Sequence, residues 1–424
     1  MKKSIIPLLG AAILLAACEN MPHEVKTLTL TSEERVINSR QNEFSLDLLK
    51  QVCANEKSSE NVFLSPLGVA FVCGMMTNGA EGNTLDQILA TIGAEGYSVD
   101  DLNEYYKNIL ENLPYLDKTT DMKIADAIWV DDQCHAKKDF IDANKTYYLA
   151  DVVSLDLQDQ LAPKAINDWA NKNTKGLIKE VINEPFSDDV RMVLTNAIYF
   201  KGQWAKEFKK VNTREEEFTL ASGTTATVSM MNMEKELSVT PPYDWQLYFS
   251  QIDTVPDYYD ARMLRLYFKD KAYCMDIVLP REGINCEDYL AEFDMEQLKE
   301  LEELLCSYNV EVKLPKFTLK YHRDLNEDMQ TLGMTDAFNG QLADFSGIAE
   351  EDLYLNKLFQ DSFLEVDEEG AKAAAVTTSF FTNAAAPDRA VEPFIVNRPF
   401  LLFIRECKYG TILFAGKIGH PETK

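Results

Sequence analysis

The sequence is poor in the residues that most catalytic and metal sites require. Its 424 residues include only four histidines, which are scattered along the chain: His23, His135, His322 and His420. It contains no H-E-x-x-H helix, no phosphate-binding glycine loop and no G-x-S-x-G turn. We therefore predict no metal, no cofactor and no enzymatic activity.

Positive charge is also scarce. Lysine and arginine total 42 against 69 aspartates and glutamates, which gives a formal net charge of -27. Such an acidic surface repels a phosphate backbone, so a nucleic-acid partner is excluded. No internal repeat or low-complexity linker divides the chain, and its 46% hydrophobic composition is enough for a large core.

The apolar run near the N-terminus is too short to span a bilayer. Lys2 and Lys3 precede apolar residues 5–17, whereas a spanning helix needs about 20 residues. The order is typical of an export signal, and residues 15–18 (LAAC) resemble a bacterial lipoprotein cleavage box. We expect a signal peptide at 1–17, a lipid on Cys18, a tether at 18–32 and a single domain at 33–424. This predicts an exported protein, lipid-anchored to a bacterial membrane in the periplasm or at the cell surface; an ordinary signal peptide is the alternative.

The remaining cysteines follow no recognisable site pattern. No C-x-x-C occurs, so neither a zinc site nor a redox pair is indicated. We expect mostly buried, inert thiols. A disulfide stays open outside the cytoplasm, but spacing does not select one among the seven: Cys53, Cys73, Cys134, Cys274, Cys286, Cys306 and Cys407.

Periodicity and capping residues predict a mixture of helices and strands. Ser65 is placed to cap one helix, and Asn196 lies within an almost continuously apolar strand, where it requires a hydrogen-bond partner. The last two strands form a hairpin. The predicted helices are 39–54, 66–78, 98–112 and 163–173. The predicted strands are 191–200, 309–319, 400–405 and 411–418.

Residues 366–386 (VDEEGAKAAAVTTSFFTNAAA) have conflicting local preferences. The alanines favour a helix, whereas the Val-Thr-Thr and Phe-Phe stretches favour a strand. Read as a strand, one face of residues 371–379 carries the small residues Ala371, Ala373, Ala375, Thr377 and Ser379. The segment alone is compatible with a mobile strand, an alanine-rich helix or a linker.

Several further segments, taken in order, resemble the serpin family. They are NVFLSPLGVAF at 61–71, TNAIYFKGQW at 195–204, LPKF at 314–317, LGMTDAF at 332–338, ADFSGI at 343–348, FLEVDEEGAKAAA at 363–375, NRPFLLFIRE at 397–406 and TILFAGKIGHP at 411–421. The resemblance implies a single α+β domain with three β-sheets, about nine helices and an exposed reactive-centre loop.

The resemblance also implies a mechanism. In inhibitory serpins a serine protease cuts the loop and forms an acyl-enzyme; the loop then inserts into the main sheet and traps the enzyme. The small residues on one face favour such an inhibitor here. The alternative is a non-inhibitory serpin that acts as a binding or carrier protein. The expected partner is a serine protease, with a cysteine protease left open, and the expected state is a monomer.

The family's functional positions map onto this chain individually. Counting seventeen residues from Glu368 places the cut at Ala384–Ala385, which suits elastase-like or broad-specificity proteases. The runners-up are Ala386 and Arg389, and Arg389 would instead suit a trypsin-like enzyme. The hinge comprises Glu368, Glu369, Gly370, Ala371, Ala373, Ala374 and Ala375.

Two internal clusters complete the resemblance. Ser65, Asn196 and Gln360 match the shutter beneath the point where the main sheet opens, and Trp204, Lys316 and Glu368 match the breach at the loop's entry point. Gln360 stands where the family usually has histidine, and Gly68 where a second serine is common. We expect Gln360 to bridge Ser65 and Asn196. Because an amide does not titrate near neutral pH, we expect no pH dependence from the shutter.

Overall fold

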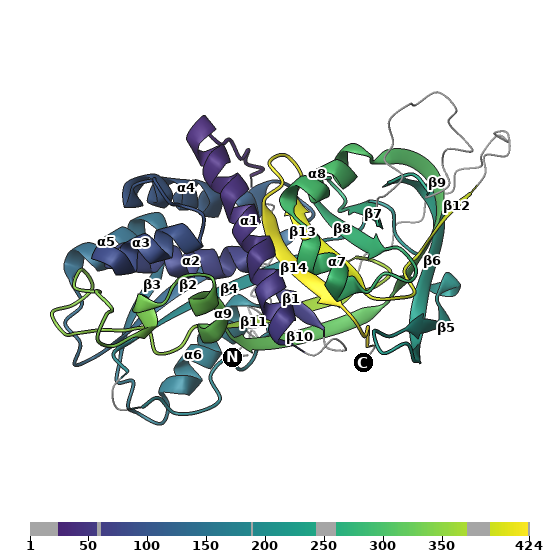
Figure 1. Cartoon of the computed structure of the whole chain (residues 1–424). Coiled ribbons are helices and arrows are strands. Elements are labelled where there is room, and N and C mark those ends of the chain that lie inside the picture. Colours follow the sequence, from purple (N-terminus) through teal and green to yellow (C-terminus); the bar gives the residue numbers. More distant parts are fainter. Residues whose placement is uncertain (1–23, 57–60, 188–189, 243–259, 371–390, 423–424) are drawn as a thin grey trace, which may run out of the picture.

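The computed structural model describes residues 24–56, 61–187, 190–242, 260–370 and 391–422, and it has an α+β architecture (Figure 1). Nine α-helices lie in these ranges. They are α1 (Ser32–Asn55), α2 (Pro66–Thr77), α3 (Gly82–Thr91), α4 (Val99–Asn112), α5 (Lys138–Tyr147), α6 (Ala162–Asn173), α7 (Cys286–Glu292), α8 (Met295–Glu303) and α9 (Asn326–Thr331). Short 3-10 turns occur at η1 (Leu113–Tyr115), η2 (Lys210–Asn212) and η4 (Asp336–Phe338).

The strands form three hydrogen-bonded sheets within the described ranges. The largest has the order β1-β14-β13-β8-β7-β6-β9-β12, with β5 paired to β6; the others are β3-β2-β4 and β10-β11. The strands are β1 (Val62–Leu64), β2 (Asp121–Asp131), β3 (Asp151–Leu155), β4 (Met192–Lys201), β5 (Arg214–Thr219), β6 (Thr225–Val239), β7 (Ala261–Tyr267), β8 (Tyr273–Pro280), β9 (Cys306–Pro315), β10 (Phe317–Asp324), β11 (Phe359–Val366), β12 (Glu392–Ile395), β13 (Phe400–Glu406) and β14 (Ile412–Ile418).

Side-chain caps fix where three of the four predicted helices begin, and α6 is the exception. The Ser98 side chain accepts from the Asp101 N–H at the start of α4, and the Ser65 side chain accepts from the Gly68 N–H at the start of α2. Helix α1 begins earlier than predicted, because Thr31 and Glu34 form a reciprocal capping box. The other helix boundaries agree with the sequence prediction to within one residue.

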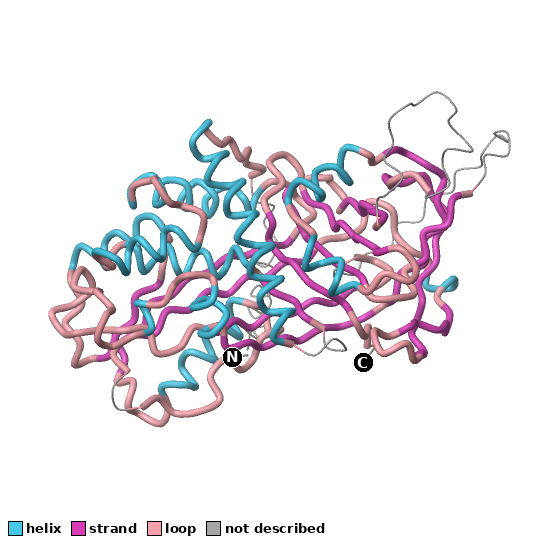
Figure 2. Tube along the Cα trace, in the orientation of Figure 1, coloured by secondary structure: helices cyan, strands magenta, loops and turns pink. Residues whose placement is uncertain are grey.

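Helix α2 lies at the centre of the molecule. All 12 of its residues are buried, which is possible because its sequence is apolar on every side. In Figure 2 the strands form a band through the middle of the molecule. In Figure 1, α3, α4 and α5 lie together toward one end, whereas α1 crosses the middle. Helix α2 packs against both β4 and β14, so it connects the large sheet to the smaller one.

The predicted C-terminal hairpin is present as β13 and β14. Both strands are fully buried, and β13 pairs with β8 on its other edge. The predicted strand at 309–319 is divided instead: Pro315 ends β9 and Phe317 begins β10. Strand β4 also differs from its prediction, because several of its residues are only half-buried rather than covered on both faces.

The chain packs against the domain before α1 begins. Leu28 and Leu30 are each 1% exposed, and the Lys26 N–H donates to the Tyr115 carbonyl at 2.9 Å. The expected tether at 18–32 therefore overlaps the folded domain at its C-terminal end. Within the described ranges, no helix combines the length and the apolar character needed to cross a bilayer.

Candidate functional site

The candidate site is a gap between β4 and β11. Strand β4 pairs with β2 on one edge and β11 pairs with β10, but no ladder joins β4 to β11 in the described part of the chain. The two strands run in the same direction: residues 194–197 and 358–361 line one cavity, and further along Gln203 bridges Gly370. Each strand therefore offers an unpaired backbone edge to the gap.

The gap widens at its lower end into a cavity of about 540 Å³. Met192, Val193 and Leu194 of β4 line one side of this cavity, and Leu358 and Phe359 line the other. Above it, a narrower pocket is lined by Gly68 and by the predicted shutter residues Asn196 and Gln360. The open edge explains why β4 is only half-buried, because no strand covers that side.

Ser65 and Gln360 are joined by a reciprocal pair of hydrogen bonds. The Ser65 N–H donates to Gln360 Oε1 at 2.8 Å, and Gln360 Nε2 donates to the Ser65 carbonyl at 2.6 Å. The Ser65 hydroxyl donates to the Leu413 carbonyl at 2.8 Å. The side chain of Gln360 thus connects β11 to the start of α2, as an amide with both a donor and an acceptor can.

The predicted bridge from Gln360 to Asn196 is wrong. Asn196 Nδ2 donates to Asp126 Oδ1 at 2.9 Å, because the register of β2 and β4 places these two residues opposite each other. Gly68 leaves space for the Asn196 carbonyl: a Cβ on Gly68 would lie 2.3 Å from Asn196 Oδ1 and 3.4 Å from Gln360 Nε2. The gap therefore separates two polar pairs, Ser65–Gln360 and Asp126–Asn196.

Asp126 is the functional candidate that the sequence analysis missed. It is 2% exposed, and its Oδ2 has no hydrogen-bond partner within the described residues. Burial raises the pKa of Asp126 to about 7, although the hydrogen bond from Asn196 opposes the shift. The expectation of no pH dependence from the shutter rested on Gln360 alone and did not include Asp126, which lies opposite Asn196. A lone carboxylate within the apolar stretch 124–130 was the available signal.

At the upper end of the gap, Glu368 forms the predicted contact with Lys316. The Lys316 Nζ to Glu368 Oε2 distance is 2.9 Å, and the Glu368 side chain is 5% exposed. The Thr213 hydroxyl also donates to Glu368 Oε1, at 2.8 Å. Burial alone would raise the pKa of Glu368, but the hydrogen bonds from Lys316 and Thr213 outweigh it and lower the pKa. Glu368 is therefore held as a carboxylate.

The backbone of the hinge is tied to the segment that follows β4. The Trp204 N–H donates to the Glu369 carbonyl and the Phe208 N–H to the Glu368 carbonyl, each at 3.0 Å. Trp204 Nε1 donates to the Asp367 carbonyl at 2.9 Å. Trp204 is 2% exposed and stacks on Phe268 with a centroid distance of 4.9 Å. These contacts close the gap at its upper end.

Gly370 is required by this arrangement. Its φ is +137°, a region that side chains strongly disfavour, and a Cβ there would lie 2.2 Å from the Gly202 carbonyl oxygen. The Glu369 side chain is more exposed than that of Glu368, and it pairs with Lys210 at 2.6 Å. The hinge residues up to Gly370 are thus fixed by backbone contacts more than by charge.

The remaining predicted site residues lie outside the described residues: Cys18, Ala371, Ala373, Ala374, Ala375, Ala384, Ala385, Ala386 and Arg389. The histidines and acids that are described include no cluster of three or more groups placed to hold a metal ion. Five of the seven remaining cysteines are buried as predicted, whereas Cys306 is exposed and Cys407 is half-buried.

Comparisons with known proteins match most of the sequence. The family described as "Serpin (serine protease inhibitor)" matches residues 39–421. Serpin B6 of Macaca fascicularis is 32% identical over 384 residues, covering 89% of this chain and 97% of that protein. The leukocyte elastase inhibitor of Xenopus tropicalis is 32% identical over 388 residues, with the same coverage.

Solved structures resemble the whole fold. Tengpin, a thermophilic serpin in its native state, superposes with a TM-score of 0.80 at 27% identity, covering 94% of this chain and 97% of Tengpin. Thyroxine-binding globulin in complex with thyroxine superposes with a TM-score of 0.78 at 25% identity, covering 92% of this chain and 100% of the globulin.

Proposed function

Because this chain belongs to the serpin family, we propose that it inhibits serine proteases as a suicide substrate. The observation that carries the proposal is the gap between β4 and β11. Two strand edges with unpaired backbone groups flank it, and the hinge residues lie at its upper end. One additional strand would satisfy both edges at once.

The reaction begins with cleavage of the loop near Ala384–Ala385. The protease serine attacks the Ala384 carbonyl carbon, and the peptide bond breaks to release the amino group of Ala385. The Ala384 carbonyl carbon is then bound to the protease serine as an ester. The freed segment Ala371–Ala384 then enters the gap. Its 14 residues gain roughly 0.5 to 1.5 kcal/mol per hydrogen bond, on the order of 10 kcal/mol in total. The intact form is therefore kinetically trapped.

The hinge contacts set the order of events. Insertion requires Glu368 and Glu369 to release the Trp204 and Phe208 amides, and it moves Glu368 away from Lys316. Cleavage removes the constraint that the loop's far end places on this movement. The first part of the segment, residues 371–379, enters with only small side chains on one face, which favours insertion before deacylation.

The target we propose is an elastase-like or broad-specificity serine protease. Alanine on both sides of the predicted cut fits a small, shallow specificity pocket. The similarity to a leukocyte elastase inhibitor is consistent with this choice. Arg389 would select a trypsin-like enzyme if the cut lay further along the loop.

Incubation with elastase, trypsin and subtilisin tests the proposal. We expect a covalent complex that survives denaturant. We also expect a released C-terminal fragment whose mass corresponds to a chain that starts at Ala385. Quantitative cleavage with full recovery of protease activity would instead favour a non-inhibitory binding protein, for which thyroxine-binding globulin is a structural precedent. The fragment mass gives the cleavage position in either case.

We also propose that Cys18 carries a lipid that anchors the protein to a bacterial membrane after export. The described chain packs against the domain from Lys26 onward, which leaves only a short connection between Cys18 and the folded body. Detergent phase partitioning of the full chain and of Cys18→Ser tests the anchor. Equal partitioning of the two proteins into the aqueous phase would reject it.

A further inference from the structure

Two cysteines far apart in the sequence lie near one end of β8 and β13, two neighbouring interior strands of the large sheet. Cys274 lies in β8 opposite Arg405 of β13, and Cys407 follows β13, with its N–H donating to the Ala272 carbonyl at 2.9 Å. This register places Cys407 diagonally next to Cys274 on the same face. The neighbouring Cys407 thiol is among the causes that raise the pKa of Cys274.

The two thiols differ in access to solvent. Cys274 is 1% exposed, whereas Cys407 is half-buried at the beginning of the turn between β13 and β14. The buried pair Cys53 and Cys286 is a useful contrast, because both of these thiols are enclosed. The first pair combines a neighbouring thiol with a cysteine that is only half-buried, so Cys407 is the more accessible of the two to a dissolved oxidant.

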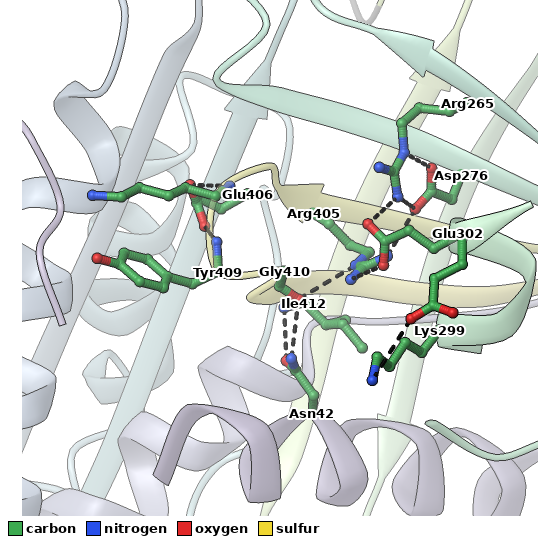
Figure 3. A network of polar contacts seen from close by, with 12 residues as sticks. Asn42, Arg265, Asp276, Lys299, Glu302, Arg405, Glu406, Tyr409, Gly410 and Ile412 are labelled. Atoms are coloured by element: carbon green, nitrogen blue, oxygen red, sulfur yellow. Dashed lines mark hydrogen bonds and ion pairs between the residues drawn. The ribbon is translucent and has the colours of Figure 1, made fainter. Parts of the chain in front are cut away.

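Arginines surround the buried thiol. Arg265 pairs with Asp276 at 2.7 Å, Arg405 pairs with the same carboxylate at 3.0 Å, and Glu302 contacts both arginines (Figure 3). The Cys407 thiol, burial and Asp276 raise the pKa of Cys274, whereas Arg265 opposes the shift. Cys274 therefore stays protonated while Cys407 is a free thiol, and Cys407 is the first to react.

We propose that Cys274 and Cys407 form a reversible disulfide. The Cys407 thiolate attacks a low-molecular-weight disulfide such as oxidised glutathione, breaks its S–S bond and releases one glutathione thiolate. The Cys274 sulfur, on losing its proton to solvent, then attacks the Cys407 sulfur of the mixed disulfide and releases the second. The two cysteines are oxidised, one external disulfide is reduced to two thiols, and the protons balance.

The pairing has a consequence that rests on the proposed function. Cleavage near Ala384–Ala385 separates a C-terminal fragment that includes β12, β13 and β14 and contains one cysteine, Cys407. Cys274 belongs to the other fragment. The disulfide would therefore keep the two fragments covalently joined after cleavage, so that the C-terminal strands could not separate even under denaturing conditions.

The bond is tested on the intact full chain, independently of inhibition. After equilibration with oxidised glutathione and denaturation, maleimide labelling should modify two fewer cysteines than in reduced protein, and peptide mapping should find Cys274 linked to Cys407. In Cys407→Ser, oxidised and reduced protein should be labelled equally. In Cys306→Ser, a change at an exposed cysteine, oxidised protein should still be labelled at two fewer cysteines than reduced protein. Equal labelling of oxidised and reduced wild-type protein would overturn the proposal.

The consequence is tested by cutting the oxidised chain with subtilisin. Non-reducing denaturing gels should keep the fragments together in wild-type protein and release the C-terminal fragment after reduction; Cys274→Ser should release it without reductant. Release from oxidised wild-type protein would contradict the disulfide. If subtilisin left the loop uncut, the proposed function would be contradicted, while the labelling result would still decide the disulfide.

Discussion

At the scale of single residues, Asp126 changes how the site should respond to pH. Its carboxyl is buried in β2 against Asn196, and its pKa is raised to about 7. A carboxyl with a raised folded-state pKa binds more protons folded than unfolded. Stability is therefore lost as pH rises from about 4, the unfolded value, through about 7.

Replacing Asp126 with asparagine should remove this loss. Each pKa unit corresponds to about 1.4 kcal/mol, so Asp126→Asn should be more stable than wild type at pH 8 by up to a few kcal/mol. It should gain almost nothing at pH 4.5, where the wild-type carboxyl is already protonated. Thermal unfolding at both pH values measures this difference, and a gain of the same size at both would refute it.

Gln360 offers a second test at this scale. Its two hydrogen bonds to the Ser65 main chain connect β11 with α2 across the polar pocket. Gln360→Leu keeps much of the volume but leaves the buried Ser65 N–H unpaired, at about 1 to 3 kcal/mol. The Ser65 carbonyl still accepts from the Val69 N–H at 3.2 Å. We expect a lower unfolding temperature. Gln51→Leu, the same substitution in α1, is the control for a change of hydrophobicity; equal effects would argue against the hydrogen bonds.

At the scale of elements, the hinge is the part that the proposed mechanism requires to move. The Glu368 side chain is held by Lys316 and Thr213, and its backbone carbonyl by the Phe208 amide. A lysine at this position would be repelled by Lys316 and would lack the two carboxylate oxygens that accept from Lys316 and Thr213. Glu368→Lys should release the hinge early and promote self-insertion or polymers. Size-exclusion chromatography during mild heating measures this, with Glu369→Lys as the matched control.

The control is informative because Glu369 makes only a more exposed pair with Lys210. Such surface pairs contribute about 0 to 1 kcal/mol. If Glu368→Lys remained monomeric and inhibited normally, the hinge carboxylate would have no restraining role. If both variants polymerised equally, general loss of negative charge would explain the effect.

At the scale of the whole molecule, the main prediction concerns the cleaved form. Filling the gap between β4 and β11 converts two exposed edges into paired strands, so the cleaved protein should unfold at a much higher temperature than the intact one. Calorimetry before and after limited proteolysis measures the shift. An unchanged unfolding temperature would mean that the segment stays outside the sheet.

The sequence predicted local structure better than long-range partners. Ser65 and Ser98 could be recognised as caps because their partners lie three residues away. The Lys316–Glu368 contact came only from the family resemblance, since nothing in spacing connects residues on different strands. Asn196 was rightly expected to need a partner, but Asp126 follows from the register of β2 against β4, which spacing does not encode.

The common direction of β4 and β11 determines the direction in which an inserted strand would run and how far its cut end would move. A chain that leaves Gly370 at the upper end and enters between these strands is antiparallel to both. Each inserted residue therefore moves the cut end about 3.3 Å toward the lower end of the gap. Over the predicted 14 residues this amounts to roughly 45 Å. A protease covalently attached to that end would be displaced by the same distance, toward the end of the gap where the 540 Å³ cavity lies.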